Sequence, residues 1–208
     1  MPRAGLTAAD VVQAAADIAD ERGYQQLTIG LVAARLGIRA PSVYKHVSGL
    51  AELQHQLATQ AVTELGDGIA TAVAGRAGRD ALAALARACR SYVTAHPGRY
   101  EATVGAEFTG QDDPLLAASA RVIELIAAVL RGYRIPEPSV VHAIRTVRCV
   151  LHGWCMLQLT NAFQWSGNVE ESFEQLISFM DDGLRGAGQA EQAAPSSAGG
   201  GQAAARQA

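Results

Sequence analysis

Residues 27–53 read LTIGLVAARLGIRAPSVYKHVSGLAEL, and this stretch decides the fold. Apolar side chains recur at helical spacing over Ile29–Leu36, and the hydroxyl of Thr28 stands before them as a helix N-cap. Gly37 follows, where a tight turn between two helices requires a residue without Cβ. A third short helix is expected over Ala40–His46, with a proline in its first turn, where a missing N–H costs nothing. The pattern predicts a helix-turn-helix.

The outward face of that third helix is suited to the major groove of DNA, which admits one helix. Arginine can pair with a guanine edge through two hydrogen bonds, serine can contact a base or a phosphate, and alanine permits close approach. Polar side chains near the helix end can contact phosphates and so fix orientation. The candidate DNA-binding residues are Thr28, Arg39, Ala40, Pro41, Ser42, Tyr44, Lys45 and His46.

Charge is unevenly distributed along the chain. The formal net charge is −3 at pH 7, so overall basicity does not indicate a nucleic-acid partner. The segment from Arg22 to Ala51 nevertheless contains Arg22, Arg35, Arg39 and Lys45 and no acidic residue. A locally basic stretch in an acidic chain fits a small DNA-contacting element joined to a larger domain. A chance gap in the acidic residues is the alternative.

This stretch resembles the DNA-binding domain of the tetracycline-repressor (TetR) family of transcriptional regulators. The matching positions are Leu27, Thr28, Leu36, Gly37, Ile38, Tyr44, His46, Val47 and Leu53. The turn Ala40-Pro41-Ser42 resembles the base-contacting positions of the tetracycline-repressor branch. One departure is Leu50, where the family has a lysine that contacts phosphate. Arg39 and Lys45 would then carry more of the charge.

The remaining pattern predicts an all-α protein, in which an N-terminal three-helix helix-turn-helix domain precedes a C-terminal helical ligand-binding and dimerisation domain. A hinge is expected at the glycines of residues 66–68 and 75–78. Residues from Gly186 onward include no large apolar side chain, which is typical of a flexible tail. The expected division is residues 1–49 for the helix-turn-helix, 50–65 for a connecting helix, 66–185 for the second domain and 186–208 for the tail.

The resemblance also implies partners. It implies a homodimer through the last two long helices, expected over Pro138–Phe163 and Asn168–Leu184, packed as a four-helix bundle. The two recognition helices would then lie about 34 Å apart and read a palindromic operator in double-stranded DNA. Since the family consists mostly of repressors, it implies repression relieved by a small, largely apolar effector. Activation stays open, and the position of the operator relative to the promoter would decide it.

The effector is expected in the second domain. The penultimate helix is apolar nearly all round, so one side can line a cavity and the other an interface. Within it, His152-Gly153-Trp154 resembles a short signature of one branch of the family. Packing in an ordinary core is the alternative for each residue taken singly. The candidate ligand-binding residues are Tyr92, Tyr100, Val104, Phe108, Ile126, His152, Trp154 and Met156.

Several other kinds of site find no support. The three cysteines, Cys89, Cys149 and Cys155, lack CxxC spacing, which argues against a disulfide framework or a structural zinc site. His152 and Cys155 could share a helix face, but a third metal ligand is not apparent, so packing is preferred. The sequence contains no GxSxG, P-loop or HExxH motif. We therefore predict no catalytic residue, no metal and no cofactor.

The chain starts without an apolar signal segment and has no apolar run of membrane length, which predicts a cytoplasmic protein. Two other classes of function stay open. One is a helical ligand-binding protein without specific DNA binding, supported only by Leu50. The other is a helical enzyme, which no catalytic constellation supports.

Overall fold

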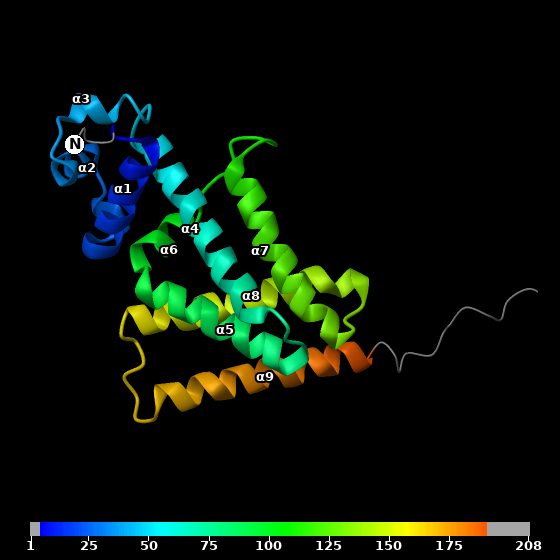
Figure 1. Ribbon diagram of the computed structural model, residues 1–208. Helices are drawn as coiled ribbons and strands as arrows, with labels where there is room; N and C mark the ends of the chain where they lie inside the picture. Colours follow the sequence, from blue (N-terminus) through cyan, green and yellow to red (C-terminus); the bar gives the residue numbers. More distant parts are fainter. Residues whose placement is uncertain (1–4, 191–208) are drawn as a thin grey trace, which may run out of the picture.

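The computed structural model describes residues 5–190, and within that range it contains helices and no strand. The helices are α1 (Ala8–Arg22), α2 (Ile29–Leu36), α3 (Ala40–Val43), α4 (Leu50–Val73), α5 (Gly78–Ala95), α6 (Pro97–Thr103), α7 (Pro114–Leu130), α8 (Glu137–Leu159) and α9 (Val169–Ala190). In Figure 1, α1 to α3 form a small unit at one end, and α4 leads from it into a larger helical body. The predicted all-α fold with an N-terminal helix-turn-helix is confirmed.

The helix-turn-helix is built from local signals. The hydroxyl of Thr28 accepts a hydrogen bond from the Leu31 amide at 3.2 Å, which caps α2. Gly37 ends α2 in the left-handed conformation, with φ 67° and ψ 29°, as the sequence predicted. Val43 then packs fully buried beneath α3. These contacts fix the angle between α2 and α3.

Helix α3 is shorter than the expected range Ala40–His46. Its regular part ends at Val43, after which the chain continues as a turn. The His46 amide donates to the Val43 carbonyl at 2.9 Å, a bond over three residues instead of four. The Val47 amide also donates to the Val43 carbonyl, at 3.2 Å, and both valine side chains are buried in the core.

Helix α4 is longer than expected, and the predicted break at residues 66–68 was wrong. The connecting helix covers Leu50–Val73 instead of ending at residue 65. Gly66 serves close packing: a Cβ at this position would lie 3.3 Å from Cγ2 of Val122 on α7. The break falls later, at Gly75 and Gly78, whose φ angles are 71° and 53°.

Two hydrophobic cores meet along α4. Near its start, Leu53 and Leu57 belong to the core of the helix-turn-helix domain, together with Ala102 of α6. Further along, Ile69 belongs to the core formed with α5, α7, α8 and α9. Because one rigid helix contributes to both cores, a change in the larger domain can be transmitted to the smaller one.

Helix α9 extends beyond the expected start of the tail at residue 186. It continues to Ala190, while residues 191–208 lie outside the described part of the chain. Gly188 packs so closely on the loop after α7 that a Cβ there would fall 2.1 Å from the Tyr133 carbonyl oxygen. Leu184 is buried one turn earlier. Tertiary packing thus holds a segment whose composition predicted flexibility.

No helix within residues 5–190 combines the length and apolarity that crossing a lipid bilayer requires.

The start of α7 is tied to α4 through a buried carboxylate. Asp113 accepts hydrogen bonds from the amides of Thr109 at 2.7 Å and Leu115 at 2.8 Å. It also lies 2.9 Å from Nε2 of His55 on α4. The Thr109 amide is the main cause that holds the pKa of the Asp113 carboxyl well below its usual range, against the opposing effect of burial.

We expect this carboxylate to make stability depend on pH. A depressed pKa in the folded state stabilises the protein above the unfolded pKa, near pH 4, and the contribution is lost as the pH falls further. Urea unfolding from pH 7 to pH 2.5 should show a steeper loss for the wild type than for Asp113→Asn. Parallel curves for the two proteins would show that Asp113 does not contribute to the acid lability.

Candidate functional site

The outer end of the small domain presents α3 to solvent. Arg39 is the N-cap residue of α3 and is exposed, as are Pro41 and Lys45. Tyr44 is 55% exposed, which is unusual for an aromatic side chain. The other predicted contacts of this segment are half-buried: Ala40 and Ser42 in α3, and His46 in the turn after it. The exposed predicted residues are therefore Arg39, Pro41, Tyr44 and Lys45, in α3 and at its two ends.

Thr28 lies on the neighbouring helix of the same unit. Its oxygen caps α2 by accepting from the Leu31 amide, and the residue is exposed. The hydroxyl hydrogen stays free to donate to a phosphate oxygen. Capping and a phosphate contact are thus compatible at this residue.

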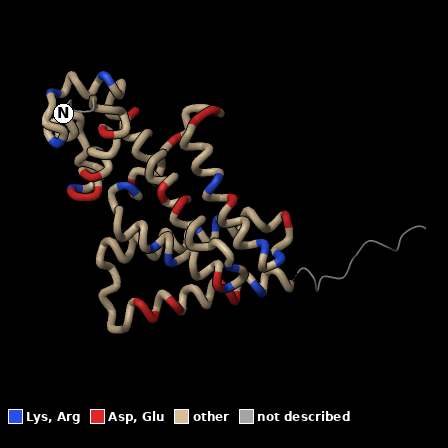
Figure 2. Tube along the Cα trace, in the orientation of Figure 1, with Lys and Arg blue, Asp and Glu red and all other residues tan. Residues whose placement is uncertain are grey.

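The basic side chains of the helix-turn-helix domain differ in whether they already form an ion pair. Arg35 forms an ion pair with Glu21 at 2.7 Å and lies 3.5 Å from Asp17, so it joins α2 to α1. Within residues 5–190, Arg39 and Lys45 form no ion pair. Figure 2 shows cations at the outer end made by α2 and α3. Two of the basic side chains are therefore free to meet an anionic partner.

The departure at Leu50 has a packing explanation. The side chain is half-buried against the core of the helix-turn-helix domain. Apolar contact thus replaces a charge at the first residue of α4. The side chain of Leu50 itself therefore offers no contact to a phosphate.

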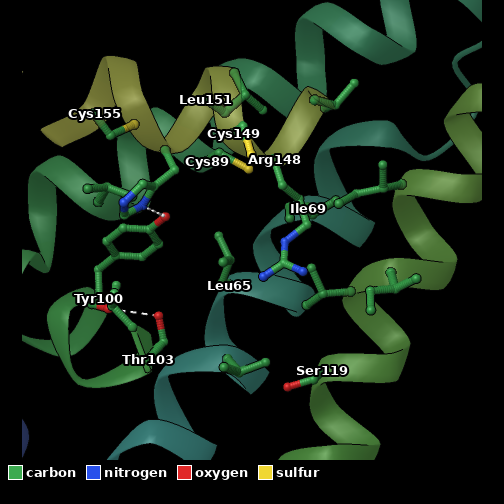
Figure 3. Close-up of a pocket in the computed structure, with 18 of the residues that line it drawn as sticks. Leu65, Ile69, Cys89, Tyr100, Thr103, Ser119, Arg148, Cys149, Leu151 and Cys155 are labelled. Carbon is green, nitrogen blue, oxygen red and sulfur yellow. Dashed lines mark hydrogen bonds between the residues drawn. The ribbon is translucent and has the colours of Figure 1, made fainter. Parts of the chain in front are cut away.

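A cavity of about 490 Å³ lies in the larger domain. Its walls come from α4 to α8, and apolar side chains such as Leu65, Ile69 and Val93 make up most of them. The hydroxyl oxygen of Tyr100, which is labelled in Figure 3, lies 2.9 Å from Nδ1 of His152. This size and this lining suit a small organic ligand.

Half of the predicted ligand-binding residues line this cavity, namely Tyr100, Val104, Ile126 and His152. The other four, Tyr92, Phe108, Trp154 and Met156, lie outside it.

The residues outside the cavity have other surroundings. The Tyr92 hydroxyl donates to Glu64 at 2.9 Å. Trp154 stacks on Phe173 of α9 with ring centroids 5.3 Å apart, so it faces away from the cavity that its neighbour His152 lines. Phe108 is exposed in the loop before α7, and Met156 is half-buried. The two conspicuous residues of the short signature therefore lie on different sides of α8.

Sequence reasoning missed the polar part of the cavity. Arg145, Arg148, Ser119 and Thr103 line it, as do the three cysteines, Cys89, Cys149 and Cys155. The signal was present in the spacing on α8, because residues 145, 148, 149 and 152 share one helix face. Burial raises the pKa of Cys89 to about 12 and that of Cys155 to about 11. Both thiols therefore stay protonated and act as apolar wall.

Helix α6 lies between the cavity and the small domain. Arg99, which is only 11% exposed, reaches Asp17 and Asp20 of α1 at 3.0 Å each, and Glu64 of α4 at 3.3 Å. The next residue, Tyr100, lines the cavity. Two consecutive residues of α6 thus have different roles: Arg99 contacts the helix-turn-helix domain, and Tyr100 lines the cavity.

The joint between α6 and α1 is also close-packed. A Cβ at Gly98 would lie 2.0 Å from the Ala19 carbonyl oxygen, so only glycine fits between the two backbones. His96 adds a contact from its Nδ1 to Asp20 at 3.1 Å. Movement of α6 must therefore carry α1 with it or open this contact.

An exposed helix-turn-helix surface is joined through α6 to a second helical domain that contains a cavity. This arrangement is typical of a one-component transcriptional regulator. The comparisons with known proteins agree. Residues 82–180 match the tetracyclin repressor-like C-terminal domain family. The chain is 32% identical over 185 residues to the HTH-type transcriptional regulator YobS of Bacillus subtilis, covering 88% of this chain and 95% of that protein. The chain belongs to the TetR family of transcriptional regulators.

Solved structures share the fold. BioQ bound to its natural double-stranded DNA operator is 24% identical and has a TM-score of 0.64, covering 87% of this chain and 99% of its own. A TetR variant from Acinetobacter baumannii in complex with minocycline is 20% identical and has a TM-score of 0.66, covering 86% of this chain and 97% of its own. At these identities the likeness is one of fold alone.

Proposed function

We propose that the protein is a ligand-responsive repressor that binds a palindromic operator as a homodimer and is released by a small, largely apolar ligand. The observation that carries this proposal is the exposure of three residues that flank α3, namely Arg39 before the helix and Tyr44 and Lys45 after it. A single helix fits the major groove, and the two free cations at the ends of α3 suit the phosphates beside it. The DNA-bound structure of BioQ supports the same use of the shared fold.

The response to ligand would run through α6. A molecule in the cavity contacts Tyr100, while Arg99 and Gly98 hold α1. A shift of α6 would change the angle of the helix-turn-helix domain and hence the spacing of two recognition helices in a dimer. Coupling free energies between such sites are typically about 1–3 kcal/mol, and near-complete switching needs about 5.5 kcal/mol.

The homodimer is proposed to form through α8 and α9. A mostly apolar hollow of about 490 Å³ lies between these two helices and is lined by Val150, Leu176 and Phe179, among others. Phe179 is 71% exposed in the isolated chain. A large exposed apolar side chain beside an apolar hollow is typical of a surface that a partner covers.

We expect Phe179→Glu to weaken the dimer at least about 30-fold, because buried aromatic anchors contribute about 2 kcal/mol or more to an interface. Light scattering across a dilution series would measure the dissociation constant. Phe108→Glu, at an exposed aromatic residue far from α8 and α9 in sequence and outside the hollow, is the matched control. Dimers of equal strength in both variants would place the interface elsewhere.

The two free cations should contribute differently to DNA binding. Arg39→Ala should cost about 1–3 kcal/mol and relax specificity at one base pair, if its guanidinium pairs with a guanine edge. Lys45→Ala should weaken all sequences alike and reduce the slope of log affinity against log salt by about one. Fluorescence anisotropy against a set of single-base operator variants measures both effects.

Arg76→Ala, at an exposed arginine remote from α3, should change neither affinity nor slope. If Arg39→Ala and Lys45→Ala lowered DNA affinity equally for all sequences, Arg39 would contact only phosphate and not a base.

A further inference from the structure

The lining of the cavity carries positive charge. Arg145 and Arg148 of α8 line it, and none of the aspartates and glutamates within residues 5–190 does. The ion pairs formed within residues 5–190 involve other arginines, so neither of these two has a carboxylate within ion-pair distance. Every arginine at the α5–α9 contact, by contrast, reaches a polar partner: Arg87 pairs with Glu174 at 2.7 Å. The two cavity arginines are thus available to a ligand.

Arg148 is placed to act on the cavity interior. Figure 3 shows its guanidinium directed inward, toward Leu65 and Ile69 of α4 and Ser119 of α7. Burial raises the pKa of the Tyr100 hydroxyl to about 12, while the charge of Arg148 acts on that pKa in the opposite direction. The guanidinium is therefore within electrostatic reach of the Tyr100–His152 pair.

A guanidinium among apolar side chains selects for an anion. Arginine binds a carboxylate through two parallel hydrogen bonds, a geometry that its planar guanidinium offers without rearrangement. Arg148 retains much of its accessible surface along α8, so it stays hydrated while the cavity is empty. A ligand that brings only hydrocarbon would strip that water without replacing its hydrogen bonds, which costs free energy.

We propose that this cavity binds an apolar molecule that carries one carboxylate, with the carboxylate on Arg148 and the hydrocarbon part between α4, α5 and α7. Arg145, one turn earlier on α8, adds a second positive charge at the same wall. The Tyr100–His152 pair offers a further polar contact for a substituent on the ligand. This inference rests on the proposed function, since it states the chemistry of the ligand that the regulator responds to.

Calorimetric titration of the full chain, without DNA, tests the charge preference. The probes are two carboxylates with matched neutral alcohols, namely decanoate with decan-1-ol and naphthalene-1-acetate with 2-(1-naphthyl)ethanol, and the cation decyltrimethylammonium. At least one carboxylate should bind about tenfold or more tightly than its alcohol, as expected for a hydrogen-bonded charge pair. The cation should bind more weakly than decanoate.

Substitutions at Arg148 test whether this residue causes the preference for carboxylates over alcohols. Arg148→Met and Arg148→Gln should each reduce the ratio of carboxylate to alcohol affinity to near one, whereas Arg148→Lys should keep part of it. Arg76→Met removes an exposed arginine outside the cavity and should leave the ratio unchanged. Thermal unfolding of each variant verifies that it is folded, and two substitutions at Arg148 guard against a single misfolded one.

Equal affinity for carboxylates and alcohols, failure of both carboxylates to bind, or a preference that survives in both uncharged Arg148 variants would overturn the proposal. Operator binding is measured separately by anisotropy. A protein that binds decanoate but no operator would contradict the proposed regulator and leave the anion site standing. A protein that binds its operator but shows no charge preference would contradict only the anion site.

Discussion

Arg99→Met is expected to lower the free energy of unfolding by about 2–3 kcal/mol, which is less than the cost of about 3–5 kcal/mol for a fully buried ion pair because Asp17 and Glu64 are each 32% exposed. The substitution keeps an unbranched apolar stem and removes the guanidinium that faces Asp17, Asp20 and Glu64. Three carboxylates from α1 and α4 would then face one another without the guanidinium between them, although Asp17 keeps Arg35 at 3.5 Å and Asp20 keeps His96 at 3.1 Å. Urea unfolding at neutral pH and fixed protein concentration measures the loss.

Arg121→Met provides the matched control. Arg121 pairs with Asp67 at 2.6 Å, but both side chains are about half exposed. Exposed pairs contribute about 0–1 kcal/mol, so this variant should be nearly as stable as the wild type. Similar, small losses for both variants would show that the Arg99 cluster does not hold α6 to the small domain.

Gly98→Ala is expected to cost about 2–3 kcal/mol, at the upper end for overpacking. The added methyl group would fall 2.0 Å from the backbone oxygen of Ala19, and a backbone cannot rotate away as a side chain can. Helix α6 would have to withdraw from α1. Since 1 kcal/mol shifts the melting temperature by about 2–4 °C in a chain of this size, the melting temperature should fall by several degrees.

Gly153→Ala is the control for glycine replacement as such. It lies within α8, and a Cβ there meets nothing within 4 Å. Alanine is the better helix former, so this variant should be as stable as the wild type or more stable by up to about 1 kcal/mol. If the Gly98→Ala and Gly153→Ala proteins had the same melting temperature, this result would contradict the close contact between α6 and α1.

Local signals made the helix-turn-helix predictable. Thr28 caps a helix, Gly37 permits the turn and an early proline starts α3, and each effect acts over a few residues. The extent of α4 was not predictable in this way. Gly66 resembles a helix break in sequence, but its role is to let α7 approach, which depends on contacts far along the chain.

Half of the predicted ligand-binding residues line the cavity, because its lining also depends on contacts that the local sequence does not determine. An apolar helix near the C-terminus indicated a wall, yet the rotation of α8 decides which residues face inward. His152 faces the cavity and Trp154 faces α9, although they are two residues apart. An apolar ligand favours aromatic residues as its predicted contacts, and nothing in the sequence around Arg148 distinguishes it from a solvent-exposed arginine. Only the folded structure shows that Arg148 lines the cavity and that, within residues 5–190, no carboxylate pairs with it.

We expect this protein to bind DNA through α3 and the residues at its two ends. The most direct test is binding of the purified protein to the DNA flanking its own gene, at two salt concentrations and against a scrambled competitor. We predict specific binding that weakens steeply with salt and that is lost in the double variant Arg39→Ala, Lys45→Ala. Binding no tighter than to scrambled DNA would contradict the claim, and a ligand-binding role without specific DNA recognition would then be the better account of the chain.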